Sequence, residues 1–336
     1  MNSKERLTRR LAGKPVDRAP NCNLIMAFAP LYIGKPQSQF YLDYKVLVES
    51  NLRVAKDFDL DILGAISDPF REVFDFGGKV EFPEDDIPLC SDNLLKSYED
   101  LPKLQIFDPY RSTRMQDRIQ GIELYKREAG SEYPIMGWVE APFAEAVDLR
   151  GMNEIMLDVY DHPEKLHQLL EICLEAEIRS AVAQIKAGAD LIGMGDAAAS
   201  LLGPDLFGAF ALPYEQRLIA AVHEAGALAR LHICGNTTAI LNLMKLSGAD
   251  IIDVDWKVNF KLACETYRGY AAACGNFDPV AVVQQGTPAR IREAVWKCLD
   301  AGDANTLIMA GCEIPLSTPH ENLKAIAEAL RDYPRY

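Results

Sequence analysis

The feature that most constrains the fold is a repeated alternation of two patterns. Short apolar runs of strand character recur along the 336-residue chain, and each is followed by a segment with helical periodicity. This alternation is typical of parallel βαβ units, whose strands are covered on both faces. Eight such runs predict the strands of a TIM (β/α)8 barrel, an α/β fold, at residues 21–26, 60–66, 134–139, 190–194, 228–233, 250–254, 270–275 and 307–311.

One connection in this pattern is much longer than the others. Residues 67–133 separate the second and third predicted strands, so we interpret them as an insertion within a single TIM-barrel domain that spans residues 1–336. Inside the insertion, residues 73–76 and 79–82 alternate in polarity around Gly77-Gly78, which predicts a β-hairpin. The hairpin either roofs the barrel mouth or decorates the surface.

Charge and cysteine usage restrict the class of protein. The chain has 49 acidic and 35 basic residues, a net charge of -14, which argues against nucleic acid as a partner. No apolar stretch is long enough to cross a membrane, and residues 1–14 lack the core of a signal peptide, so we expect a cytoplasmic protein without a membrane partner. The eight cysteines form no CxxC, which favours reduced thiols, and five are expected to be structural: Cys90, Cys173, Cys264, Cys274 and Cys298.

Polar and reactive residues gather at the carboxyl ends of the predicted strands. Catalytic groups of TIM barrels come from this end, so the residues found there are the candidates for a site. The third to eighth strands end at Glu140, Asp196, His232, Cys234, Asp253, Asp255, Asn276, Asp278 and Cys312.

Three of these residues suggest a metal. His232 and Cys234 are two apart, so their side chains point to one face of a strand, and Cys312 follows a strand farther round the barrel. One imidazole and two thiolates match a catalytic zinc site with an open fourth position. The alternative is a core histidine beside two inert thiols, which does not explain why all three lie at strand ends.

The carboxylates have several possible roles. We predict that Asp196 is a fourth ligand or a partner that orients His232, although it could instead cap a helix. Asp253 and Asp255 share a strand face and could move a proton or bind a cationic group, or form salt bridges. Glu140 is a weaker candidate of the same kind. Asn276 and Asp278 are candidates for contact with a cofactor.

Several motifs together resemble a known family. They are Lys4-Glu5-Arg6, residues 13–20 (GKPVDRAP), residues 232–237 (HICGNT), residues 275–279 (GNFDP), residues 311–315 (GCEIP) and residues 318–322 (TPHEN). In these segments, which run along nearly the whole chain, the sequence resembles the uroporphyrinogen decarboxylase superfamily. Within it, the distant Cys after His-x-Cys is similar to the zinc signature of the corrinoid-dependent methyltransferases.

This resemblance implies an activity. His232, Cys234 and Cys312 would bind zinc, and a methyl group would pass between a corrinoid (cobalamin) and either a small thiol acceptor or an O- or N-methyl donor such as a methoxyarene. The chain has no segment typical of a corrinoid carrier, so the corrinoid is expected on a separate protein that docks at a mouth ringed by Glu140, Asp196, Asp253 and Asp278. The alternatives are a decarboxylase or a non-catalytic zinc barrel that docks a corrinoid protein. Decarboxylation of a porphyrinogen is disfavoured because residues 26–32 (MAFAPLY) lack the arginines that hold its carboxylates.

Overall fold

The central element is a curled parallel sheet whose seven strands neighbour one another in sequence order. A computed structural model describes residues 1–334 of the chain. The α/β barrel predicted from the alternating pattern is confirmed. The strands are β1 (Leu63–Gly64), β2 (Ile135–Glu140), β3 (Leu191–Gly195), β4 (Leu228–His232), β5 (Ile251–Val254), β6 (Ala272–Phe277) and β7 (Leu307–Ala310).

The first predicted strand, residues 21–26, occupies its place in the barrel without forming a ladder. Asn21 makes a single parallel bridge to Ile308, and the Asn21 carbonyl accepts a hydrogen bond from the backbone of Asp61. Asparagine side chains replace the missing ladder bonds, because Asn23 Oδ1 accepts from the Ala310 amide at 2.7 Å. Pro20, which lacks an N–H, precedes this segment. The eighth wall of the barrel is therefore an irregular seam.

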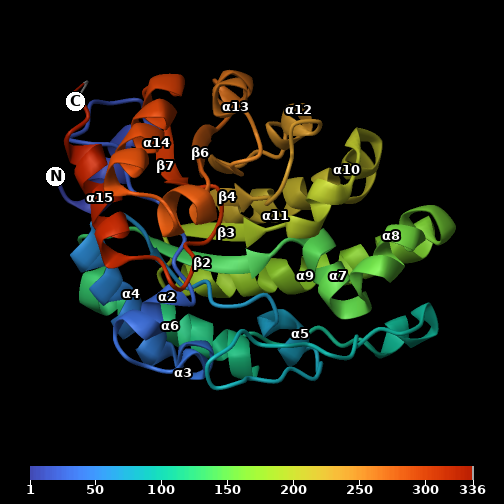
Figure 1. Ribbon diagram of the computed structural model, residues 1–336. Helices are drawn as coiled ribbons and strands as arrows, with labels where there is room; N and C mark the ends of the chain where they lie inside the picture. The colour runs from blue at the N-terminus through green and yellow to red at the C-terminus, as the bar shows by residue number, and fades with distance from the viewer. Residues whose placement is uncertain (335–336) are drawn as a thin grey trace.

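Helices cover the outside of the sheet (Figure 1). The longest helix begins at Pro163, a proline at its first position, and ends before Gly188, which has a φ of 119°. None of the helices in residues 1–334 is both long and apolar enough to cross a membrane. The α-helices are α1 (Ser3–Leu11), α2 (Phe28–Tyr32), α3 (Gln37–Leu42), α4 (Tyr44–Phe58), α5 (Arg71–Asp75), α6 (Thr113–Ala129), α7 (Pro142–Arg150), α8 (Met152–Asp161), α9 (Pro163–Ala187), α10 (Pro204–Phe210), α11 (Leu212–Glu224), α12 (Leu241–Met244), α13 (Phe260–Tyr267), α14 (Pro288–Ala301) and α15 (His320–Arg331), with short helical turns η1 (Tyr98–Lys103), η2 (Ala197–Leu201) and η3 (Pro279–Gln284).

The predicted hairpin in the insertion is wrong. Its first strand is helix α5, and the only pairing near the second is an isolated antiparallel bridge between Glu81 and Leu89 within the described chain. The glycine pair ends this helix, because the amides of Gly77 and Gly78 return to the carbonyls of Phe74 and Val73. The helix is fixed by Asp75, whose carboxylate accepts from the three amides at residues 113–115 that begin α6.

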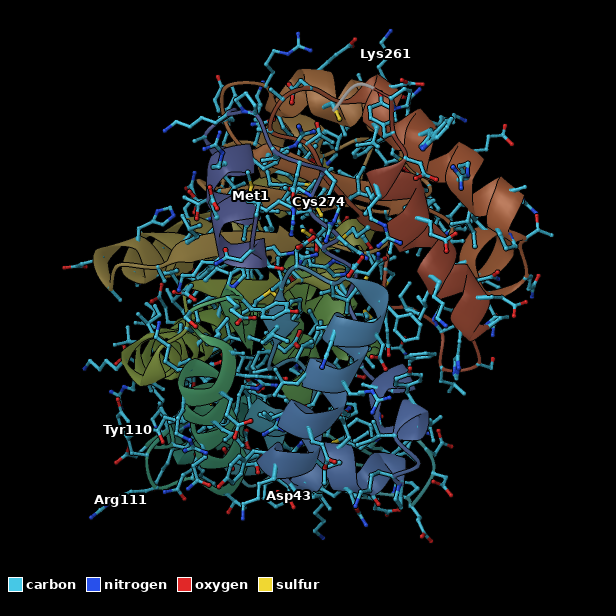
Figure 2. The ribbon with its side chains drawn as sticks, turned by 90° about the vertical axis from the view of Figure 1, so that its left-hand side faces the viewer. Met1, Asp43, Tyr110, Arg111, Lys261 and Cys274 are labelled. Atoms are coloured by element: carbon cyan, nitrogen blue, oxygen red, sulfur yellow. The ribbon has the colours of Figure 1, made fainter. Side chains whose placement is uncertain are left out.

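The barrel interior is closed at the end where the strands begin. Helix α1 places Leu7 in the same apolar cluster as the inward side chains of the strands, among them Cys22 and Cys274. Figure 2 looks at this end, with Met1 and Cys274 labelled. Both termini lie on this side of the molecule, opposite α8 and α10 (Figure 1). The connections that follow the strands therefore surround the other, open end of the barrel.

Candidate metal centre

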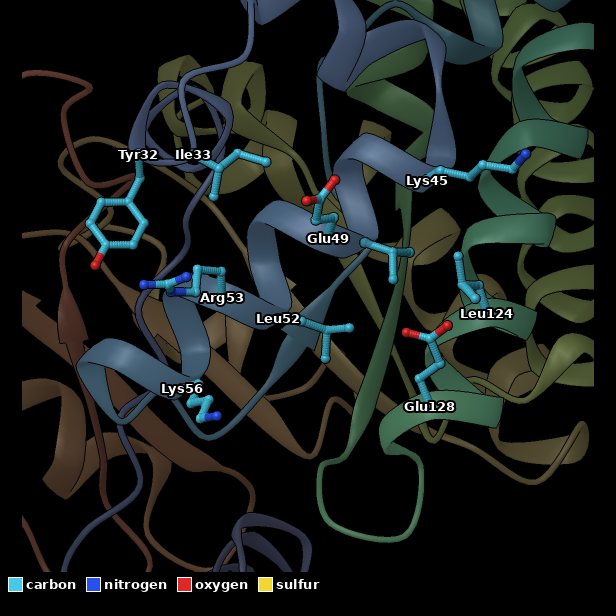
Figure 3. Close-up of a pocket in the computed structure, with 10 residues that line it drawn as sticks. Tyr32, Ile33, Lys45, Glu49, Leu52, Arg53, Lys56, Leu124 and Glu128 are labelled. Atoms are coloured by element: carbon cyan, nitrogen blue, oxygen red, sulfur yellow. The ribbon is translucent and has the colours of Figure 1, made fainter.

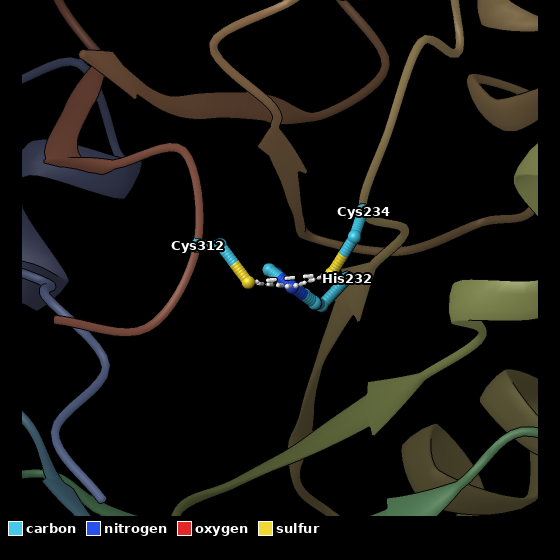
Figure 4. Close-up of side chains that lie close together, drawn as sticks. All are labelled: His232, Cys234 and Cys312. Carbon is cyan, nitrogen blue, oxygen red and sulfur yellow. Dashed lines mark hydrogen bonds between the residues drawn. The ribbon is translucent and has the colours of Figure 1, made fainter. Parts of the chain in front are cut away.

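His232, Cys234 and Cys312 come together at the open end of the barrel (Figure 4). His232 is the last residue of β4, Cys234 follows it by two residues, and Cys312 follows β7 by two residues. The imidazole Nε2 lies 2.9 Å from the Cys234 sulfur and 3.8 Å from the Cys312 sulfur, and the two sulfurs are 3.4 Å apart. Among the described residues, this is the one group of three or more His, Cys, Asp or Glu side chains close enough to share a metal ion.

The three groups perturb one another electrostatically. Hydrogen bonds from Cys234 and His232 hold the pKa of the Cys312 thiol well below its usual range. The hydrogen bond shared with Cys312, together with burial, raises the pKa of Cys234. Burial opposes protonation of His232, but the negative charge of Cys234 and the hydrogen bond to Asp253 outweigh it and hold the His232 pKa well above its usual value. The lowered pKa of Cys312 therefore favours a thiolate at this position, which is the form of cysteine that binds a metal ion.

Asp253, rather than Asp196, contacts the imidazole. The two residues His232 and Asp253 face each other on β4 and β5, and His232 Nδ1 lies 2.9 Å from Asp253 Oδ2. Arg230, two residues before His232 on β4, donates from Nε to both Asp253 oxygens at 2.9 and 3.1 Å. Burial would raise the pKa of Asp253, but the Arg230 charge and the His232 hydrogen bond keep it below its usual value.

Asp196 lies beside a different residue. It is fully buried next to Glu215 of α11, and its side chain makes no capping bond to η2. Burial raises the pKa of Asp196 to about 7, and the carboxylate oxygens of Asp196 and Glu215 have no hydrogen-bond partner among the described residues. The backbone amide of Asp196 donates to the His232 carbonyl at 2.9 Å.

Three other candidates are engaged in bonds that shape the loops of the mouth. Asp255 accepts from the amide of Gly235, next to Cys234, at 3.0 Å. The side-chain amide of Asn276 donates to the carbonyls of Asp255 and Val258 at 3.1 and 2.8 Å. Asp278 caps η3 by accepting from the two amides at 280 and 281. The polar groups of Asn276 and Asp278 are thus used within the protein.

Glu140 and Trp138 form one wall beside the candidate metal centre. The Trp138 indole nitrogen donates to Glu140 Oε1 at 3.0 Å, and its ring centroid lies 6.3 Å from that of His232. Burial, followed by the charges of nearby carboxylates, raises the pKa of Glu140 well above its usual value. Gly193 and Gly195 of β3 leave room for this wall, since a Cβ on Gly193 would come within 2.3 Å of the indole.

A second group of carboxyls is buried outside the barrel wall. Glu145 of α7 and Glu177 of α9 are both inaccessible to solvent, and their carboxylate oxygens have no hydrogen-bond partner among the described residues. Burial raises the pKa of each well above its usual value, and the mutual charge raises that of Glu145 further. Groups of this kind cost stability when they ionise.

This arrangement predicts an inverted pH dependence of stability. The pKa of Glu177 is higher in the folded than in the unfolded state. Its contribution to the free energy of unfolding is therefore fully favourable below the unfolded pKa near 4.5, and it is lost as pH rises towards the folded pKa. We expect Glu177→Gln to increase the free energy of unfolding at pH 8 by about 1–2 kcal/mol, with a smaller gain at pH 5. Urea unfolding at both pH values measures this. The exposed Glu175 of the same helix is the control, and an equal effect of Glu175→Gln would contradict the explanation.

Two residues near the centre were missed in the sequence. Arg230 could have been found, because it lies two residues before His232 and therefore on the same face of the strand that carries the zinc motif. Glu313, next to Cys312, accepts from the Ala27 amide at 3.0 Å, and burial raises its pKa to about 7. No sequence pattern linked Glu313 to the segment after the first predicted strand.

A large hollow on the molecule lies away from these residues. It has a volume of about 770 Å³ and is lined by α4, α6 and the end of α2 (Figure 3). Its floor is apolar, with Leu52 and Leu124, and charges of both signs surround it, including Lys45 and Glu128. None of the candidate site residues lines it.

Comparisons with known proteins bear on the metal centre. The profile of the family "Uroporphyrinogen decarboxylase (URO-D)" matches residues 2–333. The methylcobamide:CoM methyltransferase MtbA of Methanosarcina acetivorans is 30% identical, over 98% of this chain and 98% of its own. A uroporphyrinogen decarboxylase of Carboxydothermus hydrogenoformans is 24% identical, over 86% of this chain and 83% of its own.

A solved structure agrees with the sequence matches. The chain superposes on a methyltransferase from Methanosarcina mazei with a TM-score of 0.90 and 26% identity, covering 99% of this chain and 98% of the other. The family profile, the full-length relative and this structure all match nearly the whole chain. The superposition also agrees with the barrel described above. The chain therefore belongs to the uroporphyrinogen decarboxylase (URO-D) family.

Proposed function

We propose that the protein is a zinc-dependent methyltransferase that moves a methyl group between a corrinoid and a small substrate. One observation carries the proposal: His232 Nε2 and the sulfurs of Cys234 and Cys312 converge at the barrel mouth, in a chain 30% identical along 98% of its length to a methylcobamide:CoM methyltransferase. The small substrate is a thiol acceptor, or an O- or N-methyl donor such as a methoxyarene. The missing arginines in residues 26–32 weigh against the decarboxylase alternative.

The donor set fits zinc. Nitrogen and two sulfurs bound tetrahedrally to zinc would lie about 3.6–3.8 Å from one another. The separations here are 2.9, 3.4 and 3.8 Å, so small side-chain movements suffice. Three protein ligands leave one position for a substrate, as in catalytic rather than structural zinc sites.

The chain's own residues divide the remaining work. When bound, zinc supplies a Lewis acid that favours the thiolate of a thiol acceptor or polarises the heteroatom of a methyl donor. Trp138 and the buried Glu140 enclose one side of the site and limit access of water. Asp255 holds the amide of Gly235 and so fixes the loop that carries Cys234. We assign no proton transfer to Asp196, because its carboxyl is fully buried beside Glu215 and the imidazole is held by Asp253 instead.

The mouth supports docking of a corrinoid-carrying protein, but not through a ring of charge. The acidic residues expected to line the rim are largely inside, with Glu140, Asp196 and Asp253 exposed by 9%, 0% and 1%. Exposed apolar side chains stand instead on the connections that follow the strands, where they encircle the open end. They are Leu31, Ile87, Leu89, Met152, Leu157, Tyr160, Leu201, Trp256, Val280 and Leu316.

The decisive experiment combines metal analysis with spectroscopy. The purified protein is first assayed for zinc, and then incubated anaerobically with methylcobalamin and coenzyme M, or with cobalt(I) cobalamin and methoxyarenes. We expect close to one zinc per chain and a change between the methylcobalt and cobalt(I) absorption spectra in one of the two reactions. Turnover without any corrinoid would contradict the proposal. Zinc without turnover in either direction would favour the non-catalytic barrel.

The apolar rim gives a further prediction. Truncating Tyr160 and Leu157 of α8, which are 72% and 57% exposed, should raise the KM for a methylated corrinoid protein by about 10-fold or more. The rate with free methylcobalamin should change little, because α8 stands outside the metal centre. Tyr270→Ala is the matched control, since Tyr270 is 59% exposed but precedes β6 at the closed end of the barrel. Equal KM values for the natural protein, the protein truncated at Tyr160 and Leu157, and the Tyr270→Ala protein would exclude α8 from docking.

A further inference from the structure

An ion pair is buried in the barrel beneath the metal centre. Arg230 and Asp253 are both essentially inaccessible, and Arg230 is surrounded by apolar side chains such as Met136 and Met309. Of its two terminal guanidinium nitrogens, Nη2 donates to the Cys22 carbonyl at 3.1 Å. An apolar pair of similar size often stabilises a core as well as or better than a buried ion pair. The pair therefore calls for an explanation other than stability.

The position of Asp253 supplies that explanation. Its Oδ2 lies 2.9 Å from His232 Nδ1, where it accepts a hydrogen bond from the N–H of that nitrogen, and Nε2, which faces the two sulfurs, is then the nitrogen available to a metal. The strand register makes this contact rigid, because His232 and Asp253 are direct neighbours on β4 and β5. A histidine that ligates a metal is usually oriented in this way by its second nitrogen.

Charge balance accounts for Arg230. Two thiolates and a divalent cation cancel, so an unpaired Asp253 carboxylate would leave one negative charge at a position buried from solvent. Arg230 bonds both carboxylate oxygens and cancels that charge, while the His232 hydrogen bond is kept.

We propose that Arg230 and Asp253 are positioning residues of the metal centre: Asp253 fixes the orientation of His232, and Arg230 neutralises Asp253. This inference rests on the zinc site of the proposed function, but not on the corrinoid or the methyl transfer. Zinc affinity can be measured without a corrinoid and without methyl transfer. The role of Arg230 and Asp253 therefore stays testable if the methyltransferase assay fails.

Two double variants separate the hydrogen bond from the charges. Arg230→Met with Asp253→Asn removes both buried charges but keeps an oxygen that can accept from His232 Nδ1. Arg230→Met with Asp253→Leu removes the charges and also the acceptor. We expect the first to bind zinc within about 3-fold of the natural chain and the second about 10–100-fold more weakly. Because neither leaves an uncompensated buried charge, both should fold.

The measurements are competition titration with a zinc chelator and the visible spectrum of the cobalt(II)-substituted proteins. The Leu double variant should show altered cobalt(II) bands, whereas the Asn double variant should retain the natural ones. Asp158→Asn is the control. It breaks a buried ion pair with Arg150 that does not involve the three candidate ligands, so it should leave the zinc affinity unchanged. Equal zinc affinities of the two double variants would overturn the role of Asp253. Natural affinity and spectrum in a folded Arg230→Met protein would overturn the role of Arg230.

Discussion

Replacement of Cys312 by alanine is expected to remove nearly all zinc from the purified protein. Cys312 is the only candidate ligand that does not come from the end of β4, and its sulfur lies 3.4 Å from that of Cys234. With one imidazole and one thiolate left, the affinity should fall by at least about 100-fold, and methyl transfer should fall with it. Elemental analysis and chelator competition measure both effects, and His232→Ala and Cys234→Ala should behave alike.

A second cysteine provides the control for this experiment. Cys264 of α13 is as buried as a core residue and lies outside the metal centre, so Cys264→Ala should leave the zinc content unchanged. Full zinc retention in the Cys312→Ala protein would remove Cys312 from the site. Equal loss in both variants would show that the loss reflects unfolding rather than a missing ligand.

Asp61→Asn is expected to destabilise the protein by about 3–5 kcal/mol. Asp61 is fully buried at the closed end of the barrel and accepts from Arg6 of α1 at 2.6 Å and from Arg18 at 2.5 Å. It also accepts from the amide of Asn21 at 2.7 Å. Loss of its charge removes the ion pair of the buried Arg18 and leaves Arg6 with Asp17 alone, and urea unfolding measures the resulting loss of stability.

The same substitution two residues earlier is the control. Asp59 pairs with Arg331 at the surface, where both side chains are at least two-fifths exposed, so Asp59→Asn should change stability by no more than about 1 kcal/mol. Comparable losses for the two variants would mean that the network of Arg6, Asp61 and Arg18 contributes no more than an ordinary surface pair. Zinc content should stay near normal in both, because the network lies at the other end of the barrel.

The barrel was predictable because its pattern is local and repeated. Seven of the eight apolar runs became strands, each bounded by turns that the sequence marks, such as Gly188. The irregular seam at residues 21–26 was not predictable. Asn23 bonds through its side chain to Ala310, and this contact joins residues that are distant in sequence. The segment around Gly77 was misread because a glycine pair can end a helix as well as turn a hairpin. The contact of Asp75 with α6 decides between them.

The metal candidates were predictable for a different reason. In a barrel, the strand order alone brings the ends of β4 and β7 to one mouth, so two short motifs far apart in sequence can be placed together. The partner of His232 could not be chosen this way, because Asp196 follows β3 and Asp253 lies in β5, and both strands are neighbours of β4. The register, which pairs His232 with Asp253, and the burial of Glu215 beside Asp196 distinguish them.

The irregular seam has a consequence for how the barrel opens. Backbone bonds between residues 20–22 and β7 are few, so this junction lacks the cooperative ladder that joins β2 to β3 and β3 to β4. Local openings of a fold begin where such bonds are sparse. Cys312 follows β7 by two residues, whereas Cys234 follows β4, a strand that is paired on both sides with β3 and β5. A fluctuation that unzips the seam would therefore carry one sulfur away from the other two groups, so amide exchange along β7 and release of a metal should share one opening event.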